Sequence, residues 1–160
     1  MSGLKLIFER RSPMFNKILL ATDGSENAAQ ALKYAKYLAQ CHNAQVFIVY
    51  VFPKVPDFLG EPGYSNALAK NIARGEETIA GLVRQLQDAG LEVKSEVLEG
   101  PPADAILRVA DVRQCDLIVM GNRGHGQVSS LLVGSVSHKV IAHAKVPVLI
   151  ARSVEEESAA

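Results

Sequence analysis

The chain has 160 residues, 48% of them hydrophobic, and its 17 basic side chains balance 17 acidic ones. This length is that of one domain, which can hold a core without disulfides or a metal. A formal net charge of zero excludes a domain built to coat nucleic acid or an anionic membrane, because either needs a broad basic surface. The longest unbroken apolar run, Val46 to Phe52, is far shorter than the ~20 residues that span a bilayer. We therefore expect one globular domain with neither a nucleic-acid nor a membrane partner.

The two ends of the chain lack the periodic apolar pattern of a folded element. In residues 1–14 the charges follow a very short apolar patch, the reverse of a secretory signal, and residues 153–160 carry three consecutive glutamates. We expect a flexible N-terminal extension (1–14), one folded domain (15–152) and an acidic disordered tail (153–160). Cys41 and Cys115 show no spacing for a disulfide framework or a zinc site, so both are expected to pack as small apolar residues.

Short β-branched runs alternate with longer stretches of 3.6-residue apolar spacing, which is typical of strand–helix–strand units around a parallel sheet. The expected strands are residues 17–21, 45–51, 92–98, 116–121 and 146–151. The expected helices present apolar faces over residues 28–42, 68–89, 102–110 and 136–144, with Ile72 and Ile141 among the inward side chains. The pattern indicates an open α/β fold.

A long loop separates the second strand from the second helix. Residues 52–63 hold three prolines and two glycines, so they cannot form one regular element. Loops of this length often cover ligand sites. In an open parallel sheet the ligand crevice lies at the carboxyl ends of strands, where the strand order reverses. The loops after the first strand (21–26) and the fourth (121–134) are the candidates.

The loop after the fourth strand is rich in glycine and leads into a helix. The first turn of a helix exposes N–H groups and the positive end of its dipole, and glycines let an anion approach the main chain. From residue 117 to residue 150 there are three basic side chains, Arg123, Lys139 and Lys145, and no acidic one. A phosphate group is therefore the expected ligand of this loop.

Two common phosphate motifs are absent from the chain. Gln127, and not lysine, follows Gly126, so there is no P-loop, and no G-x-G-x-x-G follows the first strand. What remains is G-x2-G-x9-G-[ST], carried by Gly121, Gly124, Gly134 and Ser135.

That arrangement resembles the nucleotide-binding signature of the universal stress protein family. The resemblance extends from NKILLATDGSENA to KVPVLIAR, about 138 of the 160 residues. It implies a Rossmann-like fold, an open five-stranded parallel sheet of order 3-2-1-4-5 with helices on both faces. It also implies the ATP-binding kind of family member, since a sister group that lacks the glycines does not bind ATP.

The resemblance also implies a set of site residues. The loop after the first strand would contribute Ala21, Thr22 and Asp23, with alanine standing where proline is commonest in the family. Val51 would lie beside adenine, while Met120 and Gly121 would flank adenine and ribose. The residues that would hold the phosphates are Gly124, Gly134, Ser135, Val136 and Ser137.

Several of these residues have a second interpretation. Asp23 could receive a ribose hydroxyl or approach Mg²⁺, or it could cap the following helix in a capping box with Glu26. Ser135 could donate to a phosphate oxygen or cap the fourth helix. Arg123 could neutralise phosphate charge or extend into water.

The predicted function is that of a cytoplasmic ATP-binding protein of the universal stress type, a regulatory module in the stress response that responds to the bound nucleotide and acts on an unidentified downstream protein. The ligand would be ATP, or AMP or ADP, with Mg²⁺ as a candidate companion. No catalytic residue is assigned, because the stretch of residues 117–150 has no carboxylate to orient water, so ATP hydrolysis would be slow at most. The resemblance further implies a homodimer that pairs through the edge strand from Val146 to Ala151.

Two alternatives remain open. One is a nucleotide-dependent α-hydrolase of the pyrophosphatase-loop kind, although ATDGSE after the first strand matches the required SGGxDS-like loop poorly. The other is an interaction module with no bound nucleotide, against which the intact glycines argue.

Overall fold

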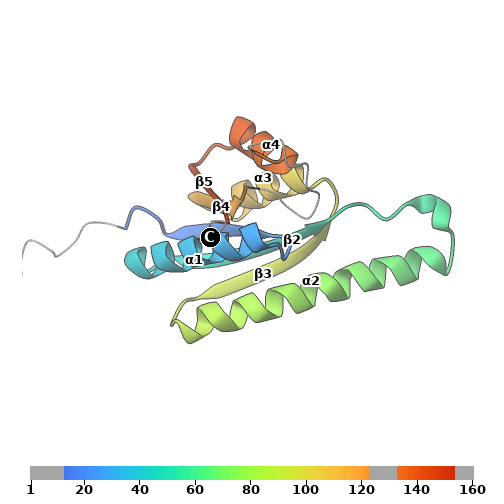
Figure 1. Cartoon of the computed structure of the whole chain (residues 1–160), viewed down its shortest axis with the longest axis horizontal. Helices are drawn as coiled ribbons and strands as arrows, with labels where there is room; N and C mark the ends of the chain where they lie inside the picture. Colours follow the sequence, from blue (N-terminus) through green and yellow to red (C-terminus); the bar gives the residue numbers. More distant parts are fainter. Residues whose placement is uncertain (1–12, 123–132, 154–160) are drawn as a thin grey trace, which may run out of the picture.

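The computed structural model of the chain describes residues 13–122 and 133–153. The elements follow in the order β1 (Lys17–Thr22), α1 (Glu26–His42), β2 (Gln45–Phe52), η1 (Asp57–Leu59), α2 (Gly63–Asp88), β3 (Val93–Glu99), α3 (Pro102–Val112), β4 (Leu117–Gly121), α4 (Ser135–His143) and β5 (Val148–Ala151). The strands form one parallel sheet of order β3-β2-β1-β4-β5. Helices α1 and α2 cover one face and α3 and α4 the other (Figure 1). The predicted fold and strand order are confirmed.

The core has two layers because successive side chains of a strand point to opposite faces of the sheet. On the face of α1 and α2, Ile18 and Ile48 pack against the alanines of α1 and against Leu86. On the other face, Leu19 and Ile118 pack against α3 and α4. The central strands are therefore apolar almost throughout, as expected where helices cover both faces.

Three predicted inward side chains lie at the surface instead. Ile141 is 49% exposed, since it lies about 100° around the helix from the buried Val140. Ile72 is 37% exposed at the rim of α2. Cys41 is exposed, so its predicted packing is wrong, whereas Cys115 is buried as expected and burial raises the pKa of its thiol to about 11.

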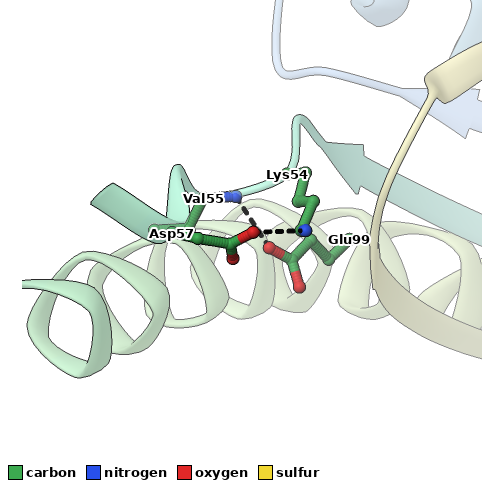
Figure 2. Close-up of polar contacts among 4 residues, drawn as sticks. All are labelled: Lys54, Val55, Asp57 and Glu99. Carbon is green, nitrogen blue, oxygen red and sulfur yellow. Dashed lines mark hydrogen bonds and ion pairs between the residues drawn. The ribbon is translucent and has the colours of Figure 1, made fainter. Parts of the chain in front are cut away.

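The segment between β2 and α2 forms an arm, residues 53–62, that carries the short helix η1. Helix α2 has 26 residues, about 39 Å, whereas β3 has seven, about 23 Å, so the start of α2 and the arm project beyond the sheet (Figure 1). The Val55 N–H donates to Glu99 Oε1 at 2.7 Å, and Lys54 Nζ donates to Asp57 Oδ2 at 2.9 Å (Figure 2). The hydrogen bond to Asp57 and its charge raise the pKa of Lys54 above its ordinary value. These contacts fix the base of the arm.

Among the described residues, no helix has the length and apolar character that crossing a membrane requires.

Candidate functional site

A hollow opens at the carboxyl ends of β1, β2 and β4, where the strand order reverses. Its lining contains most of the predicted site residues and several that were not predicted. The lining residues are Ala21, Thr22, Asp23, Ser25, Ala28, Val49, Val51, Pro102, Ile106, Met120, Gly121, Val136 and Ser137. No residue of the arm is among them, so the loop after β2 does not cover this hollow.

The apolar wall of the hollow comes from β2 and α3. Val49 and Val51 are two residues apart on β2, so they point to the same face of the sheet. Pro102 and Ile106 are four residues apart on α3 and lie on one face of that helix. The spacing from Val51 could have found Val49, whereas the approach of α3 depends on tertiary packing. A wall of this kind is suited to pack against a flat apolar ring of a ligand.

In the loop after β1, side chains of the loop accept hydrogen bonds from its backbone N–H groups. Thr22 Oγ1 accepts from the Gly24 N–H at 3.2 Å, and Asp23 Oδ1 accepts from the Ser25 N–H at 2.9 Å. Ser25 is the N-cap of α1, and its Oγ accepts from the Ala28 N–H at 3.3 Å. The capping-box interpretation of Asp23 and Glu26 is therefore wrong, because α1 begins at Glu26 itself.

The start of α4 lacks such side chains. Gly134 is its N-cap and has no side chain to accept a hydrogen bond, so Ser135 is the first helical residue and not the cap. The Gly134 N–H donates to the Asn122 carbonyl at 2.9 Å. The N–H groups of Ser135, Val136 and Ser137 have no acceptor in the part of the chain that the structure describes. Three donors and the positive end of the helix dipole thus remain beside the hollow.

Ser137 connects α4 to the end of β4. Its Oγ donates to the carbonyls of Gly121 and Asn122, at 2.9 and 3.1 Å, and the side chain is only 2% exposed. A hydroxyl has one hydrogen, so these carbonyls occupy it and the backbone N–H of Ser137 is the group left for an anion.

Gly121 has a packing role that its place in the motif did not reveal. A Cβ at this position would lie 2.8 Å from the Asn27 carbonyl carbon and 2.9 Å from the Ala28 nitrogen. Only glycine therefore lets the end of β4 lie against the first turn of α1. Arg123 and Gly124, the remaining predicted site residues, lie outside the described residues.

Asp23 is the one ionisable side chain among the lining residues. No group of three or more His, Cys, Asp or Glu side chains with the arrangement of a metal site occurs within residues 13–122 and 133–153. The geometry joins an apolar slot to a cluster of backbone donors, which suits recognition of a ring that carries an anionic group.

An open parallel sheet with such a crevice at its switch point defines an α/β protein of the Rossmann-like class. A profile described as the universal stress protein family matches residues 14–152. The chain belongs to the universal stress protein family, as the signature predicted.

Two relatives illustrate the similarity. A universal stress protein of Thermus aquaticus, found in the QAH/OAS sulfhydrylase 3′ region, is 45% identical over 145 residues, which cover 87% of this chain and all of that one. The solved structure of MJ0577, a protein of Methanocaldococcus jannaschii, has a TM-score of 0.81 at 28% identity and covers 88% of this chain and 98% of that one.

Two further solved structures contain nucleotides. A universal stress protein in complex with cAMP has a TM-score of 0.65 at 26% identity and covers 88% of this chain and 99% of that one. The universal stress protein from Archaeoglobus fulgidus in complex with dAMP has a TM-score of 0.65 at 25% identity, with 86% and 98% covered. Members of this fold family therefore bind adenine nucleotides.

Proposed function

We propose that this chain binds an adenine nucleotide, foremost ATP, in the hollow at the carboxyl ends of β1, β2 and β4. The adenine ring would lie against Val49, Val51 and Ile106, and the phosphates at the start of α4. The observation that carries the proposal is the set of three N–H groups at Ser135, Val136 and Ser137, which have no acceptor among the described residues. The bound adenine nucleotides of two related proteins support the same ligand class.

The proposed role is regulatory. Asp23 is the single carboxylate on the lining and its Oδ1 already accepts from the Ser25 N–H. If this one carboxylate holds Mg²⁺, the described lining offers no second acidic group to activate water, so slow hydrolysis at most is expected. The same carboxylate is the residue on the lining that would approach Mg²⁺ when the cation accompanies ATP. Bound and free forms would then differ in how they engage a downstream protein of the cytoplasm.

Two substitutions of Ser135 distinguish a ligand contact of its backbone N–H from a contact of its hydroxyl. Ser135→Pro removes the N–H, while a proline suits the first position of a helix and Gly134 before it is extended, at ψ 161°. Ser135→Ala keeps the N–H and removes only the hydroxyl. A hydrogen bond to a charged group contributes about 1.5–3 kcal/mol, so we expect Ser135→Pro to bind Mg-ATP about ten- to a hundredfold more weakly than Ser135→Ala in calorimetric titration.

Adenosine is the matched control ligand because it has no phosphate. Its affinity should be equal in wild type, Ser135→Pro and Ser135→Ala. Equal ATP affinity of the two variants would contradict the placement of the phosphates at α4. A wild-type protein that binds no adenine compound would contradict the proposed function as a whole.

We also propose that the protein pairs with a second copy through β5. This strand is an edge of the sheet, and its pairing with β4 uses the Pro147 and Ala151 carbonyls, so by alternation Val148 points its N–H outward. Val148→Pro removes that N–H with little change in volume, at the first residue of an edge strand where proline is tolerated. We expect Val148→Pro to lose the β5 contact and therefore to have a lower mass than wild type in sedimentation equilibrium. An unchanged mass would contradict pairing through β5.

A further inference from the structure

The tip of the arm presents Phe58, the most exposed large apolar side chain among the described residues, next to the exposed Leu59. Phe58 is 86% exposed and Leu59 is 43% exposed. Their support is fixed, since Glu99 accepts from the Val55 N–H at the base and the Tyr64 N–H donates to the Gly60 carbonyl at 2.7 Å beyond the tip. An aromatic side chain held out on a fixed support is typical of the anchors of protein–protein interfaces.

A groove with matching chemistry lies on the outer side of α2, along the edge strand β3. Its apolar lining residues are Ile72, Ile79, Ala80, Val83 and Val97. The exposed Ala69 and Ala73 continue the same flank of the helix toward its start. Strand β3 is an edge of the sheet, so nothing in the described chain covers this flank from the side of β3.

The arm cannot fill the groove of its own chain. The arm joins α2 at Gly63, and the groove residues of that helix run from Ile72 to Arg84, about 14 to 32 Å further along it. The tip of an arm can therefore reach this groove only on another molecule.

The spacing of the two features fits a twofold axis. Ile72 lies nine residues after Gly63, where the arm joins the helix, and Gly81 lies nine residues after Ile72, between the groove residues Ile79 and Val83. If two α2 helices pack antiparallel with the axis at Ile72, each arm lies opposite the groove of the other copy. Each patch then meets its complement twice, which is the condition for a closed isologous dimer.

The charges of the two patches are complementary as well. The arm carries Lys54 and Asp57, which form an exposed ion pair with each other at 2.9 Å (Figure 2). The groove carries Glu76 on the side of the proposed axis and Arg84 on the far side, and neither takes part in an ion pair within the described residues. Docking in the antiparallel arrangement would exchange the exposed Lys54–Asp57 pair, which contributes little to stability, for Lys54–Glu76 and Asp57–Arg84 pairs across the contact.

From these observations we propose that the arm, residues 53–62, inserts Phe58 and Leu59 into the groove between α2 and β3 of a second copy, reciprocally. The interface is separate from β5 and from the nucleotide hollow, so it does not rest on the proposed function. Two such contacts on one chain, at opposite edges of the sheet, would allow assemblies larger than a dimer.

Sedimentation equilibrium in the Val148→Pro background isolates the proposed contact. We expect Val148→Pro to be a dimer and Val148→Pro with Phe58→Asp to be a monomer, half its mass. Phe58→Asp should fold normally because the side chain is 86% exposed. Tyr37→Asp is the matched control, since Tyr37 is 66% exposed on α1, away from arm and groove, and should leave the dimer intact. A monomeric Val148→Pro protein, or a dimer that survives Phe58→Asp, would overturn the proposal.

Cross-linking tests the position of the axis. In a Cys41→Ser background, Ile72→Cys should form a disulfide-linked dimer under mild oxidation, because the two copies of residue 72 meet at the axis. Ile141→Cys, on the exposed side of α4, offers a thiol of similar exposure and should stay monomeric on a non-reducing gel. Equal cross-linking of the two variants, or none at residue 72, would rule out this arrangement.

Reversing the charges of the arm and of the groove tests whether these side chains face each other in the dimer. Glu76→Lys with Arg84→Glu should weaken the dimer. Lys54→Glu with Asp57→Lys, added to these two changes, should restore it, since the pairs across the contact and the pair within the arm are then all reversed. If the four changes together leave the dimer as weak as the first two, the side chains do not face each other and the proposed register is wrong.

Discussion

The starts of α1 and α4 lie at the same hollow, but their backbone N–H groups differ in whether a side chain accepts from them. At α1, Thr22, Asp23 and Ser25 each accept a hydrogen bond from a backbone N–H of the loop or of the first turn. At α4, the N-cap is Gly134, which offers no side-chain acceptor. The start of α1 is capped by its own side chains, whereas at the start of α4 three N–H groups have no acceptor among the described residues.

The difference follows from which residue precedes each helix. A serine at the N-cap places an oxygen within reach of the first turn, whereas a glycine leaves that position empty. Serines do occur at the start of α4, but Ser135 lies inside the helix and Ser137 donates to the Gly121 and Asn122 carbonyls. Serine content alone is therefore a poor guide, because the position relative to the cap decides whether a donor stays available.

The two starts are joined through Gly121, and Gly121→Ala should have the largest effect on both. The added Cβ would meet the backbone of Asn27 and Ala28 at 2.8–2.9 Å, so the end of β4 and the start of α1 must move apart. Overpacking of this kind costs about 1–3 kcal/mol. We expect a lower melting temperature by several degrees, and weaker ATP binding as well, because Gly121 lines the hollow.

Gly81→Ala is the control for that substitution. Gly81 lies in α2 with nothing within 4 Å of an added Cβ, so alanine there should stabilise the helix by about 0.5–1 kcal/mol. Thermal unfolding of both variants gives the comparison. If Gly121→Ala melts at the wild-type temperature or above it, the close packing of β4 on α1 is not present in solution.

Local patterns predicted the elements, because each depends on neighbouring residues. Alternating β-branched runs gave five strands and 3.6-residue spacing gave four helices, and α2 alone begins several residues earlier than its first apolar anchor, at Gly63. The position of the capping oxygen was missed by two residues, since Asp23 and Ser25 are both good caps and only the backbone shows which one is used.

Contacts between distant segments were beyond the reach of such patterns. The signature predicted that Gly121 contacts a ligand, but it gave no sign of the close approach of Gly121 to the backbone of Asn27, which lies far away in the sequence. The Ser137 hydrogen bonds to β4 and the approach of Ile106 to the hollow are of the same kind. No spacing along the chain encodes them, because they arise from the packing of helices on the sheet.

Ser25→Ala should have the smallest effect and bears most directly on the contrast between the two helix starts. The substitution removes the oxygen that accepts from the Ala28 N–H, and loss of an N-cap costs about 1 kcal/mol. We expect a melting temperature lower by about 2–4 °C for a chain of this size. ATP affinity should stay within about twofold of wild type, since phosphate binding is assigned to α4. The rise in melting temperature on addition of ATP should therefore be the same in both proteins, and a tenfold loss of affinity in Ser25→Ala would show that the start of α1 also carries part of the ligand.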